Sequence, residues 1–327
     1  MKPFLKLIRW QNLVIIILTQ FLMRYAILGP VTGLINVTMA STGTVEPLSL
    51  QLPLVDFIIL VLSTVFIAAG GYVINDYFDI RTDLINRGEV IVGARITRRK
   101  AMMWHNILNI AGVAAGFYIS YRVGYFWIGI IFLIVSGLLY FYSATYKRQL
   151  LIGNLVVAVM TAMVPLMVLA FEIPMIYNHY LPLVADMPSL KVPALWVLGF
   201  SAFAFITTLA REIIKDMEDF EGDMAYGSKS LPVVAGLKVS KVVVATLQII
   251  TMLLIFSVWK LYLSDTYTLV YAIVLIIIPL SGSIYLLISG RDKKAFYMSS
   301  LFMKIVMLSG ILYSLLVYII IEKGLVG

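Results

Sequence analysis

Cysteine is absent from the 327-residue chain, and histidine occurs only twice. The lack of cysteine excludes disulfide bonds, iron–sulfur clusters ligated by cysteine, and thiol catalysis. The two histidines, His105 and His179, are too few for a zinc site of the usual kind. Oxygen-bearing side chains are therefore the main candidates for metal binding and catalysis.

Charged residues are also scarce, at 13% of the chain, whereas hydrophobic residues make up 61%. Soluble domains carry about 25% charged and 45–50% apolar residues. The mean hydropathy of +0.99 indicates an integral membrane protein in contact with the lipid bilayer. The net charge of +8 is then best explained by basic loops on the cytoplasmic side, so we expect no nucleic-acid partner.

A membrane-spanning helix needs roughly 20 predominantly apolar residues. The hydrophobic runs predict an all-α, polytopic membrane bundle of nine transmembrane helices, with residues 1–327 forming a single domain. The segments 36–53 and 172–193 are predicted to be loops or short interfacial helices. The nine predicted spans are 12–34, 54–75, 101–121, 126–146, 152–171, 194–214, 240–261, 268–289 and 296–321.

The basic residues predict the orientation of the spans. If the amino terminus lies inside, most lysines and arginines fall in inside segments, above all 81–100 and 211–241. We expect a multi-pass protein of the plasma (inner) membrane, because the sequence shows no transit-type leader. Its most polar chemistry, and so its active site, would face the cytoplasm.

Two acidic segments, one after the second span and one after the sixth, share the spacing D-x2-D-x3-D. They contain Asp76, Asp79 and Asp83, and Asp216, Asp219 and Asp223. On a helix, steps of three and four residues place side chains on one face, where like charges repel. Mg²⁺ would offset this repulsion and bind a substrate diphosphate. One such segment is often a solvated helix end, but two with identical spacing beside a membrane favour a functional site.

Cationic residues near the two segments are candidates for holding the diphosphate. They are Arg81, Lys147, Arg148 and Lys215. Arginine suits bidentate phosphate contacts, and lysine acts as a point charge. The run Arg98, Arg99 and Lys100 is explained equally well by topology or by anchoring to lipid headgroups. Asn12 is a further candidate, because a polar residue near the start of the first span can reach the site if it faces the bundle.

The sequence Asn75-Asp76-x-x-Asp79-x-x-x-Asp83, together with Asp216-x-x-Asp219-x-x-x-Asp223, resembles the two aspartate-rich motifs of the UbiA superfamily of intramembrane prenyltransferases. The predicted nine spans match that architecture over essentially the whole chain. Arg9-x-x-Asn12 and the pair Tyr142 and Lys147 resemble further family features. The second acidic stretch is most similar to the branch that contains digeranylgeranylglyceryl phosphate synthases and chlorophyll synthases.

This resemblance implies Mg²⁺-dependent transfer of a polyprenyl group, for example geranylgeranyl, from its diphosphate to a lipophilic acceptor. It implies that the six aspartates bind Mg²⁺ with help from Asn75, and that Arg81, Lys147 and Lys215 hold the diphosphate. Tyr142 would stabilise the allylic cation by a cation–π interaction. The resemblance favours geranylgeranylglycerol phosphate as the acceptor.

Three alternatives remain open from the sequence. The acceptor could be an aromatic quinone precursor of the 4-hydroxybenzoate, naphthoate or homogentisate type. The carboxylates could instead belong to an ion transporter, although transporters place such groups near the bilayer midplane and not at helix ends. The third alternative is an isoprenoid-binding protein without activity.

Overall fold

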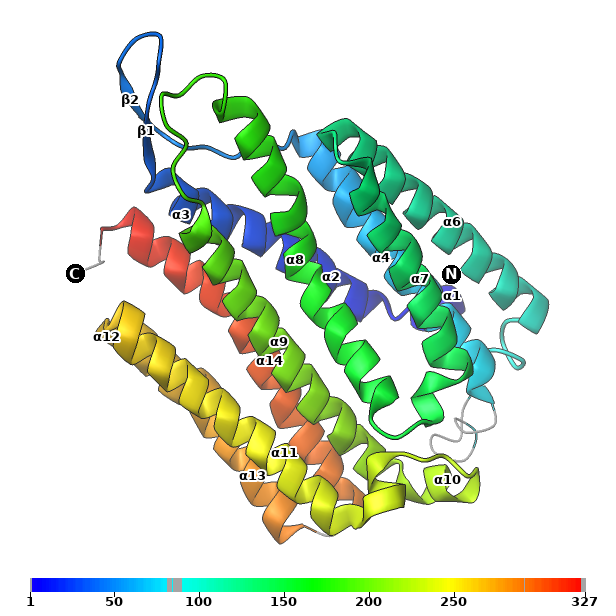
Figure 1. The fold of residues 1–327 in the computed structure, drawn as a ribbon. Helices are drawn as coiled ribbons and strands as arrows, with labels where there is room; N and C mark the ends of the chain where they lie inside the picture. Colours follow the sequence, from blue (N-terminus) through cyan, green and yellow to red (C-terminus); the bar gives the residue numbers. More distant parts are fainter. Residues whose placement is uncertain (1, 81–83, 85–89, 291, 325–327) are drawn as a thin grey trace. The chain divides into compact units, whose positions relative to one another are not determined.

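The computed structural model describes residues 2–80, 84, 90–290 and 292–324 (Figure 1). In this part of the chain, eight helical stretches are long and apolar enough to cross a membrane. The predicted all-α membrane fold is therefore confirmed, and the protein is an integral, multi-pass membrane protein. The eight stretches are Trp10–Gly33, Leu54–Phe78, Phe126–Ala144, Ile152–Tyr180, Lys191–Glu218, Leu231–Leu263, Thr266–Ser289 and Lys293–Glu322.

Several of these stretches are built from more than one helical segment. The first half of the chain contains α1 (Lys2–Leu7), α2 (Trp10–Leu22), π-helical η1 (Met23–Leu28), α3 (Gly29–Gly33), α4 (Leu54–Phe78), α6 (Arg98–Val123), η2 (Phe126–Ile128), α7 (Gly129–Ala144) and η3 (Tyr146–Arg148). The second half contains α8 (Ile152–Tyr180), α9 (Lys191–Glu218), α10 (Phe220–Ala225), α11 (Leu231–Val258), η4 (Trp259–Leu263), α12 (Thr266–Ala272), η5 (Ile273–Ile277), α13 (Ile278–Ser289) and α14 (Lys293–Glu322).

The predicted span 101–121 corresponds to α6, which accounts for the difference between nine predicted spans and eight apolar stretches. At 1.5 Å per residue a helix of this length extends about 39 Å, enough to span a bilayer. Polar residues make α6 less apolar, and two of them, His105 and Asn109, contact neighbouring helices. His105 Nδ1 lies 3.0 Å from the carbonyl oxygen of Gly70 in α4, and Ser136 Oγ of α7 donates to Asn109 Oδ1 at 2.6 Å.

A glycine allows this close contact between α4 and α6. A Cβ added to Gly70 would lie 2.3 Å from Asn109 Nδ2, so a larger residue would displace the buried amide. Small residues are a common means of bringing membrane helices together. The polar contacts and the close approach together explain how a helix with moderate hydropathy packs along α4 and α7.

The two predicted loops contain more regular structure than expected. Strands β1 (Asn36–Thr38) and β2 (Val45–Pro47) form an antiparallel pair within 36–53, with Val37 opposite Glu46. The prediction of a loop or short interfacial helix over 172–193 was wrong for its first half, because α8 continues to Tyr180 as part of one long helix. In the sequence, Pro174 and Glu172 resemble residues that end an apolar span, which explains the wrong prediction.

The chain divides into two compact units. Unit 1 comprises residues 1–144 and 163–199, and unit 2 comprises 145–162 and 200–327, so that α8 and α9 each contribute to both. In unit 1, Leu7, Val73, Val92 and Ala101 form one buried cluster. In unit 2, buried side chains of α9, α11, α13 and α14 form the core, including Ile214, Val244, Leu280 and Met303.

A buried ion pair joins distant segments within unit 1. Arg24 Nε donates to Glu172 Oε2 at 3.1 Å, and both side chains are almost fully buried. Glu172 Oε1 also accepts the backbone N–H groups of Gln51 at 2.6 Å and Leu52 at 2.9 Å. Arg24 Nη2 donates to the Leu52 carbonyl, and its guanidinium lies 4.6 Å from the ring centre of Phe57. Each charge is thus paired and hydrogen-bonded, as burial requires.

Candidate active site

The first acidic motif lies at the carboxyl end of α4 in unit 1. Asp76 belongs to the last turn of the helix, and Asp79 is the residue that ends it. Both carboxylates are buried. Asn75 Nδ2 donates to Asp79 Oδ2 at 2.8 Å, and Asp76 Oδ1 accepts a hydrogen bond from Arg9 Nη2 at 2.9 Å. The carboxylates are therefore held in defined positions by neighbouring side chains.

Arg9 connects α1 to α2 and has an unusual backbone conformation. Its φ of 50° and ψ of 53° are left-handed, a region that costs a non-glycine residue energy and is found often at functional sites. The Arg9 guanidinium lies 5.1 Å from the ring centre of Tyr72. Burial acts to lower the pKa of Arg9, but the adjacent Asp76 carboxylate outweighs it and raises the pKa above its ordinary value, with smaller contributions from Tyr72 and Tyr142.

The second acidic motif lies at the carboxyl end of α9 in unit 2. Asp216 is in the last turn of α9, Asp219 precedes α10, and Asp223 lies within α10. Asn154, in the first turn of α8, donates its Nδ2 to Asp216 Oδ2 at 2.8 Å. Asp216 also interacts electrostatically with Asp223. As in the first motif, an asparagine amide fixes one carboxylate at the end of a long helix.

Basic side chains surround this second motif. Lys215 Nζ lies 2.9 Å from Glu212 Oε2, and Arg211 Nη1 lies 3.2 Å from Glu212 Oε1. The charge of Lys147 also acts on Glu212. Three cations thus gather around one glutamate, a turn before Asp216.

The turn that carries Lys147 and Arg148 is fixed by its backbone. The carbonyl of Arg148 accepts the backbone N–H of Lys229 at 2.9 Å, and Leu151 is left-handed, with a φ of 57°. A Cβ added to Gly153 would lie 2.9 Å from Lys147 Cα, so α8 begins in close contact with this turn. The exposed side chains of Lys147 and Arg148 are therefore carried by an ordered support.

The structure brings most of the predicted site residues into these two groups. Asn75, Asp76, Asp79 and Tyr142 belong to the first group. The second group consists of Lys147, Arg148, Lys215, Asp216, Asp219 and Asp223. Asn12 is exposed on the first turn of α2, three residues after Arg9. Arg81 and Asp83 lie outside the described residues.

Three residues of these groups were missed as site residues: Arg9, Asn154 and Glu212. Arg9 appeared in the Arg9-x-x-Asn12 motif, but nothing in the sequence indicated its pairing with Asp76. Asn154 stands out as a polar residue at the start of an apolar span, directly after a basic turn. Glu212 lies four residues before Asp216, on the same helix face.

The chemistry of both groups suits a metal-bound diphosphate. Carboxylates supply hard oxygen ligands, and the asparagine amides hold two of these carboxylates in place. Mg²⁺ is usually bound by one or two carboxylates together with waters and substrate phosphates. Among the described residues, no three His, Cys, Asp or Glu side chains gather into a metal-binding group by themselves. The assignment of the six aspartates as Mg²⁺ ligands therefore stays a prediction.

Comparisons with known proteins give the family. The model of the UbiA prenyltransferase family matches residues 27–308. A digeranylgeranylglyceryl phosphate synthase from Methanosphaera stadtmanae is 34% identical over 75% of this chain and 81% of its own length. A second one, from Methanobrevibacter smithii, is 34% identical over 78% of this chain and 84% of its own.

A solved structure of a UbiA homologue from Archaeoglobus fulgidus, bound to GPP and Mg²⁺, has the same fold. Its TM-score is 0.56 at 18% identity, and the match covers 94% of this chain and 99% of the homologue. The family model covers most of this chain, including both acidic motifs, and the curated relatives exceed 30% identity. This protein therefore belongs to the UbiA prenyltransferase family.

Proposed function

We propose that the protein transfers a geranylgeranyl group from geranylgeranyl diphosphate to geranylgeranylglyceryl phosphate in a Mg²⁺-dependent reaction. The main support for this proposal is that the two acidic motifs are built alike. Each places aspartates at the end of a long helix, and in each an asparagine amide donates to one carboxylate oxygen at 2.8 Å. The names of the relatives support this donor and acceptor, and the Mg²⁺-bound homologue supports the metal.

The residues present fit Mg²⁺, because the site offers oxygen donors without cysteine or clustered histidine. The residues that would hold the ion are Asp76, Asp79, Asp83, Asp216, Asp219 and Asp223. The ion, when bound, neutralises charge on the departing diphosphate. Asn75 and Asn154 hold Asp79 and Asp216 in position by hydrogen bonds that need no rearrangement.

The chain's own cations and aromatic rings contribute the remaining steps. Lys147, Arg148, Lys215 and Arg81 bind diphosphate oxygens. As the bond between C1 of the donor and the diphosphate oxygen breaks, Tyr142 stabilises the allylic cation with the face of its ring. The acceptor hydroxyl oxygen then bonds to C1 and passes its proton to the released diphosphate, which leaves an ether. Asn12, on the first turn of α2, contributes to substrate binding.

The same proposal includes the setting of the reaction. Both motifs follow spans whose adjoining loops are basic, which supports an active site on the cytoplasmic side of the membrane. The membrane in this proposal is the plasma membrane. Residues 1–327 act as a single prenyltransferase domain.

The test is product formation by the purified protein in detergent. Geranylgeranyl diphosphate and Mg²⁺ are supplied with geranylgeranylglyceryl phosphate or with 4-hydroxybenzoate, and products are identified by mass spectrometry. The Asp79→Ala/Asp219→Ala variant is compared with Glu46→Gln, which removes an exposed carboxylate on β2. We expect ether product with the glyceryl acceptor, normal activity in the Glu46 variant, and a loss of at least about 100-fold in the double variant.

The outcomes distinguish the alternatives. Product with 4-hydroxybenzoate alone would replace the proposed acceptor by an aromatic one. No product with either acceptor, from protein that elutes as a folded species, would contradict the proposed enzymatic function. Full activity of the double variant would remove the two aspartates from the mechanism.

A further inference from the structure

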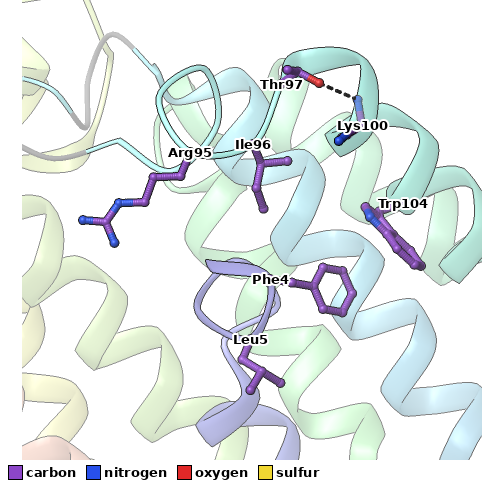
Figure 2. A pocket seen from close by; sticks show the side chains of 7 residues that line it. All are labelled: Phe4, Leu5, Arg95, Ile96, Thr97, Lys100 and Trp104. Carbon is purple, nitrogen blue, oxygen red and sulfur yellow. Dashed lines mark hydrogen bonds between the residues drawn. The ribbon is translucent and has the colours of Figure 1, made fainter. Parts of the chain in front are cut away.

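Apart from the two acidic motifs, unit 1 contains a cavity of about 580 Å³ beside the start of α6. Its lining is mainly apolar, with Phe4 and Leu5 of α1, Ile96, and Trp104 of α6 (Figure 2). The rings of Phe4 and Trp104 lie 4.8 Å apart, centre to centre, and form one continuous aromatic wall. Binding of a hydrocarbon chain in an apolar cavity of this kind is favourable, because apolar surface is removed from water.

Two cations line the same cavity. Figure 2 shows Arg95 extending on one side of Ile96, while Lys100 lies on the other side, near Trp104. Both side chains are exposed. With Arg98 and Arg99, the six residues 95–100 carry four positive charges and no acid. The cavity therefore combines an apolar interior with a cationic rim.

The cations stand on an ordered backbone. Gly93 is left-handed, with a φ of 95°, and its N–H donates to the Ile96 carbonyl at 2.8 Å. The N–H groups of Arg95 and Ile96 both donate to the Ile91 carbonyl, at 2.9 and 3.0 Å. Thr97 Oγ1 caps α6 by accepting the Lys100 backbone N–H. Backbone hydrogen bonds thus fix the positions from which the rim cations extend.

We propose that this cavity binds an anionic phospholipid of the surrounding bilayer, with its phosphate at the rim that carries Arg95 and Lys100 and part of an acyl chain along Trp104 and Phe4. Charge complementarity favours a phosphate with net negative charge, because basic residues at a membrane surface attract anionic lipids. The apolar wall favours a ligand that carries a chain. Tryptophan and basic residues at a helix end are typical of the bilayer interface, where the headgroups of such lipids lie.

The test measures quenching of Trp104 fluorescence by lipids with brominated acyl chains. The full chain is reconstituted in vesicles containing brominated phosphatidylglycerol or brominated phosphatidylcholine with the same chains. The Trp104→Phe variant identifies the part of the quenching that comes from Trp104. The Arg95→Gln/Lys100→Gln variant is compared with Lys260→Gln/Lys323→Gln, which removes the same charge from exposed positions elsewhere.

We expect Trp104 to be quenched preferentially by phosphatidylglycerol. Each basic residue near a membrane surface contributes about a fivefold preference for anionic lipid, so the Arg95 and Lys100 double variant should lose roughly 30-fold of the preference. The Lys260 and Lys323 variant should keep it. Raising salt from about 0.1 M to 1 M shortens the screening length from about 10 Å to 3 Å and should reduce the preference in the unmodified protein.

Three results would overturn the proposal. The first is equal quenching of Trp104 by the two lipids in the unmodified protein. The second is an unchanged preference after both rim cations are replaced. The third is relief of quenching by millimolar glycerol 3-phosphate, which would assign the rim to a free phosphate and not to a membrane lipid. Prenyl transfer is not measured in any of these assays, so their outcome is independent of the proposed enzymatic function.

Discussion

Replacing Glu172 by glutamine should leave the charge of Arg24 buried without a counter-ion. The variant keeps the shape of the side chain, and its amide oxygen can still accept the N–H groups of Gln51 and Leu52. Its NH₂ group, however, faces Arg24 Nε. In the unmodified protein this nitrogen donates to a carboxylate oxygen at 3.1 Å. Removing one partner of a buried ion pair costs about 3–5 kcal/mol.

The assay is thermal unfolding of the purified protein in detergent. A loss of 1 kcal/mol lowers the melting temperature by about 2–4 °C in proteins of 150–250 residues, so we expect a fall of roughly 10 °C. Glu46→Gln is the comparison, because it is the same acid-to-amide change at an exposed carboxylate of the same unit. That change should cost about 0.5 kcal/mol or less.

A double variant separates the ion pair from other effects of substitution. Arg24→Met/Glu172→Met removes both charges and keeps unbranched side chains of similar length. Its loss of unfolding free energy should be smaller, by at least about 2 kcal/mol, than the sum of the losses in Arg24→Met and Glu172→Met. The reason is that neither charge is left unpaired in the double variant. Additive losses, or a Glu172→Gln variant as stable as Glu46→Gln, would refute the reasoning.

The remaining predictions concern the site and the helix contacts. Asn154→Ala should raise the Mg²⁺ concentration needed for half-maximal prenyl transfer about tenfold or more, because Asp216 loses the amide that holds it; titration of activity with Mg²⁺ measures this. Gly70→Ala should destabilise the protein by about 1–3 kcal/mol, since the new methyl meets Asn109, whereas Gly137→Ala should be nearly neutral because its Cβ meets nothing within 4 Å; thermal unfolding compares them. EDTA should abolish prenyl transfer and excess Mg²⁺ should restore it; activity that persists in EDTA would contradict the metal requirement.

Much of the fold was predictable because the solvent is a bilayer. A span in lipid must be helical and long enough to cross, so hydropathy alone located the long helices to within several residues at most ends. The clearest exception, the end of α8, has a physical reason. Glu172 lies inside this helix because Arg24 neutralises it. Hydropathy is a sum over one segment and contains no information about partners from other segments.

The same limit applies to the candidate site. The spacing of the aspartates identified both motifs, because the three-and-four step of a helix is a local property. Arg9 and Asn154 escaped prediction as site residues because their partners lie 67 and 62 positions away in sequence. The left-handed conformation of Arg9 was equally invisible, since arginine has no preference for it.

The Arg24–Glu172 pair also bears on how the chain is assembled in the membrane. The two residues are 148 positions apart, so the first span is synthesised long before α8 exists. An arginine at the centre of a span raises the free energy of membrane insertion by about 2.5–3.5 kcal/mol. Before α8 exists, only the apolar residues of the first span can offset this penalty. The pair forms only once α8 has entered the bilayer. Formation of this contact therefore waits for α8, so the ion pair fixes the first span only after the intervening helices have been made.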